Sequence, residues 1–274
     1  MFKARIICIL MLLQGCLFAQ LSTCHAQCGI ENTAFKAGEF LSYDLYFNWK
    51  FVWVKAGTAS MSTVKSSFEG KEALRTSLIT RSSDRVDKVF MLRDTLLSYV
   101  TPGLSPLYFR KGAHEGDRYY VDEIWFTYPK GNCHLKQHQM NHRGEHAWKQ
   151  TEYSVCIYDM MDMFLKARNF DISKMKKGEK TTLPIADGRR LFNSWITYRG
   201  KQNVAMKDNS AKFRCAVFSF YEKEDGETSE IARFFVTDDQ NHVPVRIDLF
   251  LRFGSAKAYL KSWKGLRNPM KARL

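Results

Sequence analysis

The sequence predicts a mostly β protein in which long antiparallel strands form a curved sheet or open barrel, with one short helix packed on it. Three observations lead to this fold class. Phe, Tyr and Trp make up 14% of the 274 residues, and aromatic side chains suit the half-buried face of a strand. Apolar and polar residues alternate over long stretches, which is typical of strands. Helical spacing occurs in a single segment, so strands and helices do not alternate as in a nucleotide-binding α/β fold.

The N-terminus has the build of a secretory signal peptide. Two basic residues precede an apolar run over 6–13, and a stretch of small and polar residues ends at Ala26. The run is too short to span a bilayer, which takes about 20 apolar residues. We therefore expect residues 1–26 to be removed and the protein to be periplasmic or exported. The alternative is a membrane-anchored lipoprotein modified at Cys16, but Gln14 fits a lipoprotein-processing site poorly.

Residues 27–274 are predicted to form a single β-rich domain, because all-β folds of this size often run as one unit. The formal net charge is +14, and two basic residues lie in the signal. An exported basic protein meets anionic lipid head groups and anionic polysaccharide rather than nucleic acid. An anionic envelope surface is therefore a candidate partner, with the basic segment 257–273 as its contact and a flexible end expected there. A merely solvated basic surface is the simpler interpretation, and we favour it.

The clearest strand signal lies over residues 41–53. Every second position there is apolar: Leu41, Tyr43, Leu45, Phe47, Trp49, Phe51 and Trp53. The pattern predicts one long strand with one face on a core and the other in water. Strands usually have five or six residues, so this length indicates a broad, curved sheet. Gly57 then precedes a second predicted strand, Thr58–Val64.

Further strands are predicted at short, hairpin-like intervals along the rest of the chain. They are Ala73–Arg81, Thr95–Val100, Tyr119–Tyr128, Cys133–Met140, Ala147–Val155, Leu191–Tyr198, Lys212–Glu222, Ile231–Thr237, Pro244–Phe253 and Ala256–Trp263. Turn-forming pairs such as Glu69-Gly70 and Asp225-Gly226 separate several of them.

The one predicted helix covers Asp159–Asn169, with Asp159 as its N-cap. Its apolar face is expected to carry Met160, Met161, Phe164, Leu165 and Arg168. A strongly curved sheet needs a helix or a ligand on its concave face. The methionine-rich helix suits that place, and Met can adapt its shape to a guest.

An apolar ligand would contact the aromatic stripe of the first strand and this helix. The candidate ligand-binding residues are Tyr43, Phe47, Trp49, Trp53, Met160 and Phe164. The competing interpretation is that these side chains form ordinary core.

Four histidines are spaced by four residues: His134, His138, His142 and His146. On a helix this spacing would place them on one face, where they could bind a metal. Their neighbours instead predict a hairpin with His142 at the tip and His134 and His138 on one strand face. We therefore expect polar surface histidines, no metal and no cofactor.

The usual catalytic motifs are missing from the sequence. It has neither a Gly-x-Ser-x-Gly motif nor a Gly-rich phosphate loop. Two acidic pairs, Asp159/Asp162 and Asp238/Asp239, invite comparison with glycosidase carboxylates. The first pair includes the predicted helix cap, and the second lies in a predicted turn, Asp238–Asn241. The sequence therefore predicts a protein that is not an enzyme.

Four cysteines follow the signal: Cys28, Cys133, Cys156 and Cys215. Export permits disulfides, but this spacing is not that of a disulfide scaffold, and the pairing stays open. Cys133 and Cys215 lie within predicted strands, where a free cysteine behaves as a small apolar residue.

Several short blocks together resemble an exported family known only as domain of unknown function 3108. The blocks are Phe35–Tyr43, Lys55–Ala59, Asp159–Arg168 and Val236–Val245, followed by Gly254 and Leu260. Phe235 and Val236 stand where the family usually has Trp. The resemblance implies an exported, mostly antiparallel β protein without known enzymatic activity, and it has no catalytic residues to carry over.

Taken with that resemblance, the sequence indicates a non-catalytic envelope protein that binds an apolar or amphipathic, lipid-like ligand in its curved sheet. The alternative is a structural or interaction protein of the envelope whose core is filled by its own side chains. An open apolar cavity on the order of a few hundred Å³ near the candidate residues would favour the ligand, and a filled space would favour the alternative.

Overall fold

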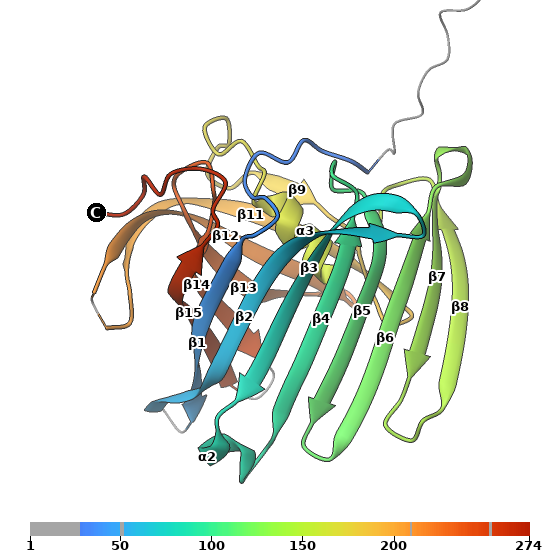
Figure 1. The fold of residues 1–274 in the computed structure, drawn as a ribbon, viewed down its shortest axis with the longest axis horizontal. Coiled ribbons are helices and arrows are strands. Elements are labelled where there is room, and N and C mark those ends of the chain that lie inside the picture. Colours follow the sequence, from blue (N-terminus) through green and yellow to red (C-terminus); the bar gives the residue numbers. More distant parts are fainter. Residues whose placement is uncertain (1–27, 50–51, 209, 252–253) are drawn as a thin grey trace, which may run out of the picture.

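The structure is a computed structural model that describes residues 28–49, 52–208, 210–251 and 254–274. Fifteen strands form one antiparallel sheet that curves strongly and does not close (Figure 1). Neighbours in the sheet follow the order of the chain, except that β1 lies beside β15. The first and last strands of the sequence therefore meet in the middle of the sheet, and the mostly β prediction is confirmed.

The strands are β1 Phe40–Trp49, β2 Val52–Phe68, β3 Lys71–Ser82, β4 Leu92–Val100, β5 Pro106–Glu115, β6 Arg118–Thr127, β7 Cys133–Met140, β8 His146–Tyr153, β9 Lys180–Thr182, β10 Ile185–Asp187, β11 Arg190–Ala205, β12 Lys212–Glu224, β13 Glu227–Thr237, β14 Pro244–Leu251 and β15 Gly254–Lys264. The helical elements are α2 Asp84–Asp87, α3 Met160–Ala167 and a 3-10 turn, η1 Pro129–Gly131. Strands β8 and β10 lie at the two ends of the strand order, and the short β9 pairs with β11.

The alternation over 41–53 belongs to two strands, so the prediction of a single long strand is wrong. β1 and β2 form a hairpin in which Phe47 pairs with Val54 and Asn48 with Trp53. Paired residues share a face of the sheet, so Trp53 lies on the face of polar Asn48, opposite that of Phe47. Every second residue stays apolar in the sequence through the turn, although Trp53, after the turn, lies on the other face of the sheet from Phe47. The side chain of Trp49 and residues 50–51 lie outside the described part.

β5, β9, β10 and α2 were not predicted. β5 begins with a proline and contains Arg110, Lys111 and Gly112 in succession, which lowers its strand signal. β11 also continues to Ala205, beyond its predicted end, because a bulge between Tyr198 and Gly200 absorbs the glycine.

Helix α3 lies inside the curve of the sheet, where it contacts β4 and β10 (Figure 1). Asp159 is its N-cap, as predicted, and accepts a hydrogen bond from the Asp162 amide at 2.8 Å. The predicted apolar face needs correction, because Met160 is 38% exposed and Met163 is buried instead. The helix is packed on several sides, so its buried residues do not form one stripe.

Three hydrophobic clusters meet at this helix. Met161 belongs to the largest, with Leu41, Ile124 and Leu135 of the sheet. The other two clusters contain Met163 with Phe218 and Phe220, and Leu165 with Phe35 and Leu104. The helix therefore joins the strands on both sides of it into one packed interior.

Cys28 and Cys156 form a disulfide that joins the start of the described chain to the segment before α3. Cys133 and Cys215 are buried free thiols among the described residues, so the structure gives the pairing that the sequence left open. The predicted signal peptide and Cys16 lie outside the described part.

The C-terminal segment is docked on the protein, so the expectation of a flexible end is wrong. The amides of Lys271 and Ala272 donate to the Asp239 carboxylate at 2.9 and 3.1 Å. Arg267 donates to the Asn32 carbonyl at 2.8 Å. Residues far from the tail in sequence therefore hold it in place.

In the part of the chain that the structure describes, no helix has the length and apolarity needed to cross a membrane.

Candidate functional site

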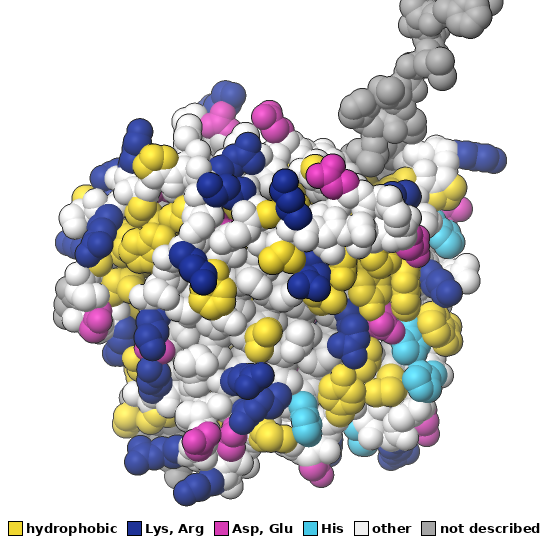
Figure 2. All heavy atoms as spheres, viewed as in Figure 1, with side chains coloured by type: hydrophobic (Ala, Val, Ile, Leu, Met, Phe, Trp, Pro, Cys, Tyr) yellow, Lys and Arg dark blue, Asp and Glu magenta, His cyan; other side chains and the backbone are white. Residues whose placement is uncertain are grey.

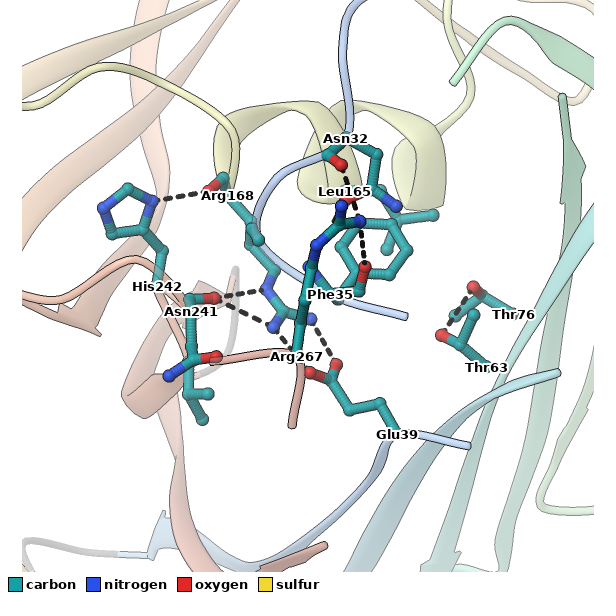
Figure 3. A network of polar contacts seen from close by, with 12 residues as sticks. Asn32, Phe35, Glu39, Thr63, Thr76, Leu165, Arg168, Asn241, His242 and Arg267 are labelled. Atoms are coloured by element: carbon teal, nitrogen blue, oxygen red, sulfur yellow. Dashed lines mark hydrogen bonds and ion pairs between the residues drawn. The ribbon is translucent and has the colours of Figure 1, made fainter. Parts of the chain in front are cut away.

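Arg168, at the C-terminal end of α3, is the largest fully buried side chain among the described residues. Its guanidinium nitrogens donate to both carboxylate oxygens of Glu39, at 2.6 and 2.9 Å (Figure 3). They also donate to the Asn241 carbonyl at 3.3 and 3.0 Å. The ring of Phe35 covers the guanidinium at 5.1 Å. A bidentate, fully paired geometry is what a buried charge requires.

Glu39 is placed by the entry into β1. Gly38 has a φ of 95°, a conformation that favours glycine, and its amide donates to the Thr63 carbonyl at 2.8 Å. Gly265 follows β15, and a Cβ there would lie 2.0 Å from the Gly38 carbonyl oxygen. Two glycines thus let the ends of β1 and β15 approach closely enough to aim Glu39 at the helix.

The turn between β13 and β14 supplies the other side of the network. Asp239 accepts from the Thr237 hydroxyl at 2.9 Å and from the Asn241 amide at 3.0 Å. These bonds confirm the predicted turn and aim the Asn241 carbonyl at Arg168. His242, at a φ of 44°, donates from Nδ1 to the Arg168 carbonyl, and burial lowers the pKa of its imidazole.

Three of the sequence blocks that carry the family resemblance therefore converge at one point. Glu39 comes from the first, Arg168 from the helical block, and Asn241 and His242 from the turn block (Figure 3). Arg168 and Glu39 are 1% and 2% exposed, so a solute cannot reach their charges. The arrangement can pin the helix to the sheet.

A second buried ionisable cluster lies at the other end of α3. Burial raises the pKa of Asp159 to about 7 and raises that of Asp162 well above its usual range. Both Asp162 oxygens lack a hydrogen-bond partner among the described residues. Lys166, whose pKa burial lowers, donates to the Cys28 carbonyl. The Asp159/Asp162 pair is thus enclosed in the core rather than placed across a cleft.

Little space remains between α3 and strands β11–β13. A cavity of about 10 Å³ remains between the helix and β11–β13, lined by residues such as Met163, Phe164, Phe218 and Phe234. That is about the least volume that holds one water molecule. The rings of Phe164 and Phe234 lie 5.8 Å apart. Side chains of α3 therefore occupy this part of the concave side of the sheet.

The described candidate ligand-binding residues do not line a common space. Tyr43 is buried on β1, and Phe164 packs between α3 and the sheet. Phe47 is half-buried on β1, and Met160 turns toward solvent. Trp53 lies on the opposite face, with the Lys257 ammonium 4.2 Å from its ring centroid.

A depression of about 440 Å³ lies over β15, β1, β2 and β3. Its lining includes the hydroxyl side chains Ser42, Thr58, Ser60 and Ser262 and the cations Arg81 and Lys261. Ser42 and Ser262 hydrogen-bond to each other at 2.7 Å. The lining also includes Tyr43, Ala59 and Ile79, so polar and apolar side chains share the depression.

The family model described as "Protein of unknown function (DUF3108)" matches residues 42–261. Among solved structures, the chain is similar to a β-barrel-like protein of the domain of unknown function DUF1849 from Brucella abortus. The identity is 12% and the TM-score 0.52, over 84% of this chain and 99% of that one. This likeness concerns the fold alone.

A second solved structure, a protein with a YmcC-like fold from Bacteroides fragilis, is 9% identical over 86% of this chain and 100% of that one. Its TM-score is 0.36, which is too low to support a structural argument. No curated protein matches the chain.

Proposed function

This chain belongs to the DUF3108 family of proteins of unknown function, and we propose that it is an exported, non-catalytic structural or interaction protein of the cell envelope. The observation that carries the proposal is the filled concave face, where α3 leaves about 10 Å³ against β11–β13. A pocket for a lipid-like ligand has a volume of roughly 300–1,000 Å³. An apolar ligand between α3 and β11–β13 would therefore have to displace the helix.

Displacement of α3 is opposed at both of its ends. The Cys28–Cys156 disulfide ties down the segment before the helix, and the Arg168–Glu39 pair holds its last turn. Pulling the helix out would expose the buried guanidinium and leave the Glu39 carboxylate unpaired, which is costly. The filled core thus supports the structural interpretation over the lipid carrier.

The disulfide supports an exported location, because disulfides persist in oxidising environments such as the periplasm.

A partner would have to bind to the outer surface of the protein. We propose an anionic envelope surface, met through the cations Arg81 and Lys261 at the depression over β15, β1, β2 and β3. Co-sedimentation with anionic vesicles, lost at high salt, is the expected sign of this contact.

The filled core is tested with apolar probes. The protein should show no saturable uptake of a fluorescent fatty acid, because the helix occupies the space. Phe218→Ala is the matched variant, since it removes a 2% exposed ring from the lining of the residual cavity. That variant should bind benzene, as engineered apolar cavities do, while the unmodified protein should not. Stoichiometric fatty-acid uptake by the unmodified protein would overturn the proposal.

A further inference from the structure

Two of the four regularly spaced histidines meet on the hairpin β7–β8. The Nε2 atom of His138 lies 2.8 Å from Nδ1 of His146. The ring planes are within 10° of each other and their centroids are 5.0 Å apart, so the rings lie nearly in line. Figure 2 shows histidine side chains gathered at the right-hand side of the face it presents, beside a hydrophobic patch. His134 and His142 make other contacts, with Thr127 and Tyr120.

The tautomer of His138 follows from its other nitrogen. Nδ1 lies 2.8 Å from the Glu123 carboxylate, which can only accept, so Nδ1 carries the proton. The lone pair of Nε2 is then directed at His146. A carboxylate that holds one imidazole nitrogen while the other is free to bind is the usual support of a metal-ligating histidine. Tyr108 in turn donates to Glu123, and the Trp148 ring packs 4.3 Å from the His138 ring.

A metal ion fits between the two nitrogens once the His146 ring moves away from His138 and turns out of line with it. At metal–nitrogen distances of about 2.1 Å and a tetrahedral angle, two ligand nitrogens are roughly 3.4 Å apart. His138 is 7% exposed and held in place, whereas His146 is exposed at the start of the edge strand β8. The shift can therefore be made by His146 alone.

A third ligand is available from the same face. Among the described residues, no three His, Cys, Asp or Glu side chains are grouped closely enough to hold a metal ion. Met140, however, pairs directly with His146 in the β7–β8 ladder. It also lies two residues after His138, so both side chains project from one face of the sheet. Its thioether sulfur is a soft ligand.

We propose that His138, His146 and Met140 form a copper site on the hairpin β7–β8. Copper stands at the top of the affinity order of divalent metals for nitrogen ligands, and thioether sulfur selects Cu(I). Lys136 lies nearby on the same face, with its ammonium 5.0 Å from the Trp148 ring centroid. A monovalent ion tolerates that cation better than a dication does, which further favours Cu(I).

The site is tested by metal titration of the oxidised protein with two readouts. Cu²⁺ should quench tryptophan fluorescence, because Trp148 lies against His138, and competition with a Cu(I) chelator should report one equivalent of Cu⁺. His146→Ala should weaken both affinities at least tenfold. His142→Ala is the matched control, since it removes an exposed histidine from the same hairpin, and it should bind as the unmodified protein does.

Two further variants separate the site from general surface binding. Met140→Leu should weaken Cu⁺ more than Cu²⁺, because the thioether matters most to the softer ion. Trp148→Phe should lose most of the quenching while retaining chelator-measured binding. The proposal is overturned if His146→Ala binds copper as tightly as the unmodified protein, or if His142→Ala weakens binding to the same extent.

Discussion

At the scale of single residues, Arg168 decides how the helix is held. The side chain is 1% exposed and pairs with Glu39, which is 2% exposed. A buried pair adds little stability over apolar side chains of the same volume, but removing one partner leaves a buried charge uncompensated. The convergence of three sequence blocks on this pair gives it a specific task, namely to set where α3 ends against the sheet.

Either Arg168→Ala or Glu39→Ala should lower the free energy of unfolding by about 3–5 kcal/mol, because each leaves one buried charge unpaired. The double variant should lose less than the sum of the two. Urea denaturation followed by tryptophan fluorescence measures these losses. Lys174→Ala is the control: its partner is Asp171 and its side chain is 83% exposed, so this variant should unfold at nearly the same urea concentration as the unmodified protein. If Arg168→Ala destabilised the protein no more than Lys174→Ala does, Arg168 would not be a buried charge that depends on Glu39.

The sequence placed the residues around Arg168 in separate short segments, but it did not predict that these segments contact each other. Asp159 was predicted as a cap and Asp238–Asn241 as a turn, since caps and turns depend on local chemistry. The pairing of Arg168 with Glu39 was not predicted, because the partners are 129 residues apart. Neither local propensity nor periodicity reports such a distance.

At the scale of elements, α3 carries carboxyl groups whose ionisation opposes its burial. Desolvation raises the pKa of Asp159 to about 7, above the unfolded value of about 4. The folded state then binds more protons than the unfolded state between these two pH values. Stability due to this group is therefore fully present below about pH 4 and falls as the pH rises to about 7.

Asp159→Asn should abolish that loss while keeping the cap, because an asparagine oxygen also accepts from the Asp162 amide. Its free energy of unfolding should exceed that of the unmodified protein at pH 8, by an amount on the order of a few kcal/mol, and the gain should shrink toward pH 4. Urea denaturation at the two pH values gives the comparison. An equal effect at both would show that Asp159 does not change its ionisation on folding.

Elements were predicted well where local signals mark their ends. β7 was predicted with its observed bounds, because turn-forming residues stand on both sides of it, Pro129–Gly131 before and Asn141–Gly144 after. α3 was found by its spacing, but its buried face was misassigned, since the helix is enclosed by three clusters. The β1–β2 hairpin was missed because the alternation continues through its turn.

At the scale of the whole molecule, connections between distant parts of the sequence hold the open sheet together. The first strand lies beside the last, and the Cys28–Cys156 disulfide joins residues 128 apart in the sequence. The fold class could be predicted from alternation along the chain. The meeting of the termini and the disulfide could not, because they depend on pairings that no local pattern encodes.

Replacing both cysteines, as Cys28→Ser with Cys156→Ser, should lower the free energy of unfolding by about 2–5 kcal/mol, since the cross-link restricts the unfolded chain. Thermal and urea denaturation measure the loss. Dithiothreitol provides the control: it should destabilise the unmodified protein by the same amount and leave the double variant unchanged. Equal stability with and without the reductant in the unmodified protein would contradict a structural disulfide.

The central claim is that α3 and the surrounding side chains fill the interior, so that the protein acts through its outer surface. Native mass spectrometry of the protein purified from its own envelope tests this most directly. The account predicts the mass of the processed chain alone, without an apolar adduct. A stoichiometric co-purifying lipid that is released on unfolding would contradict it.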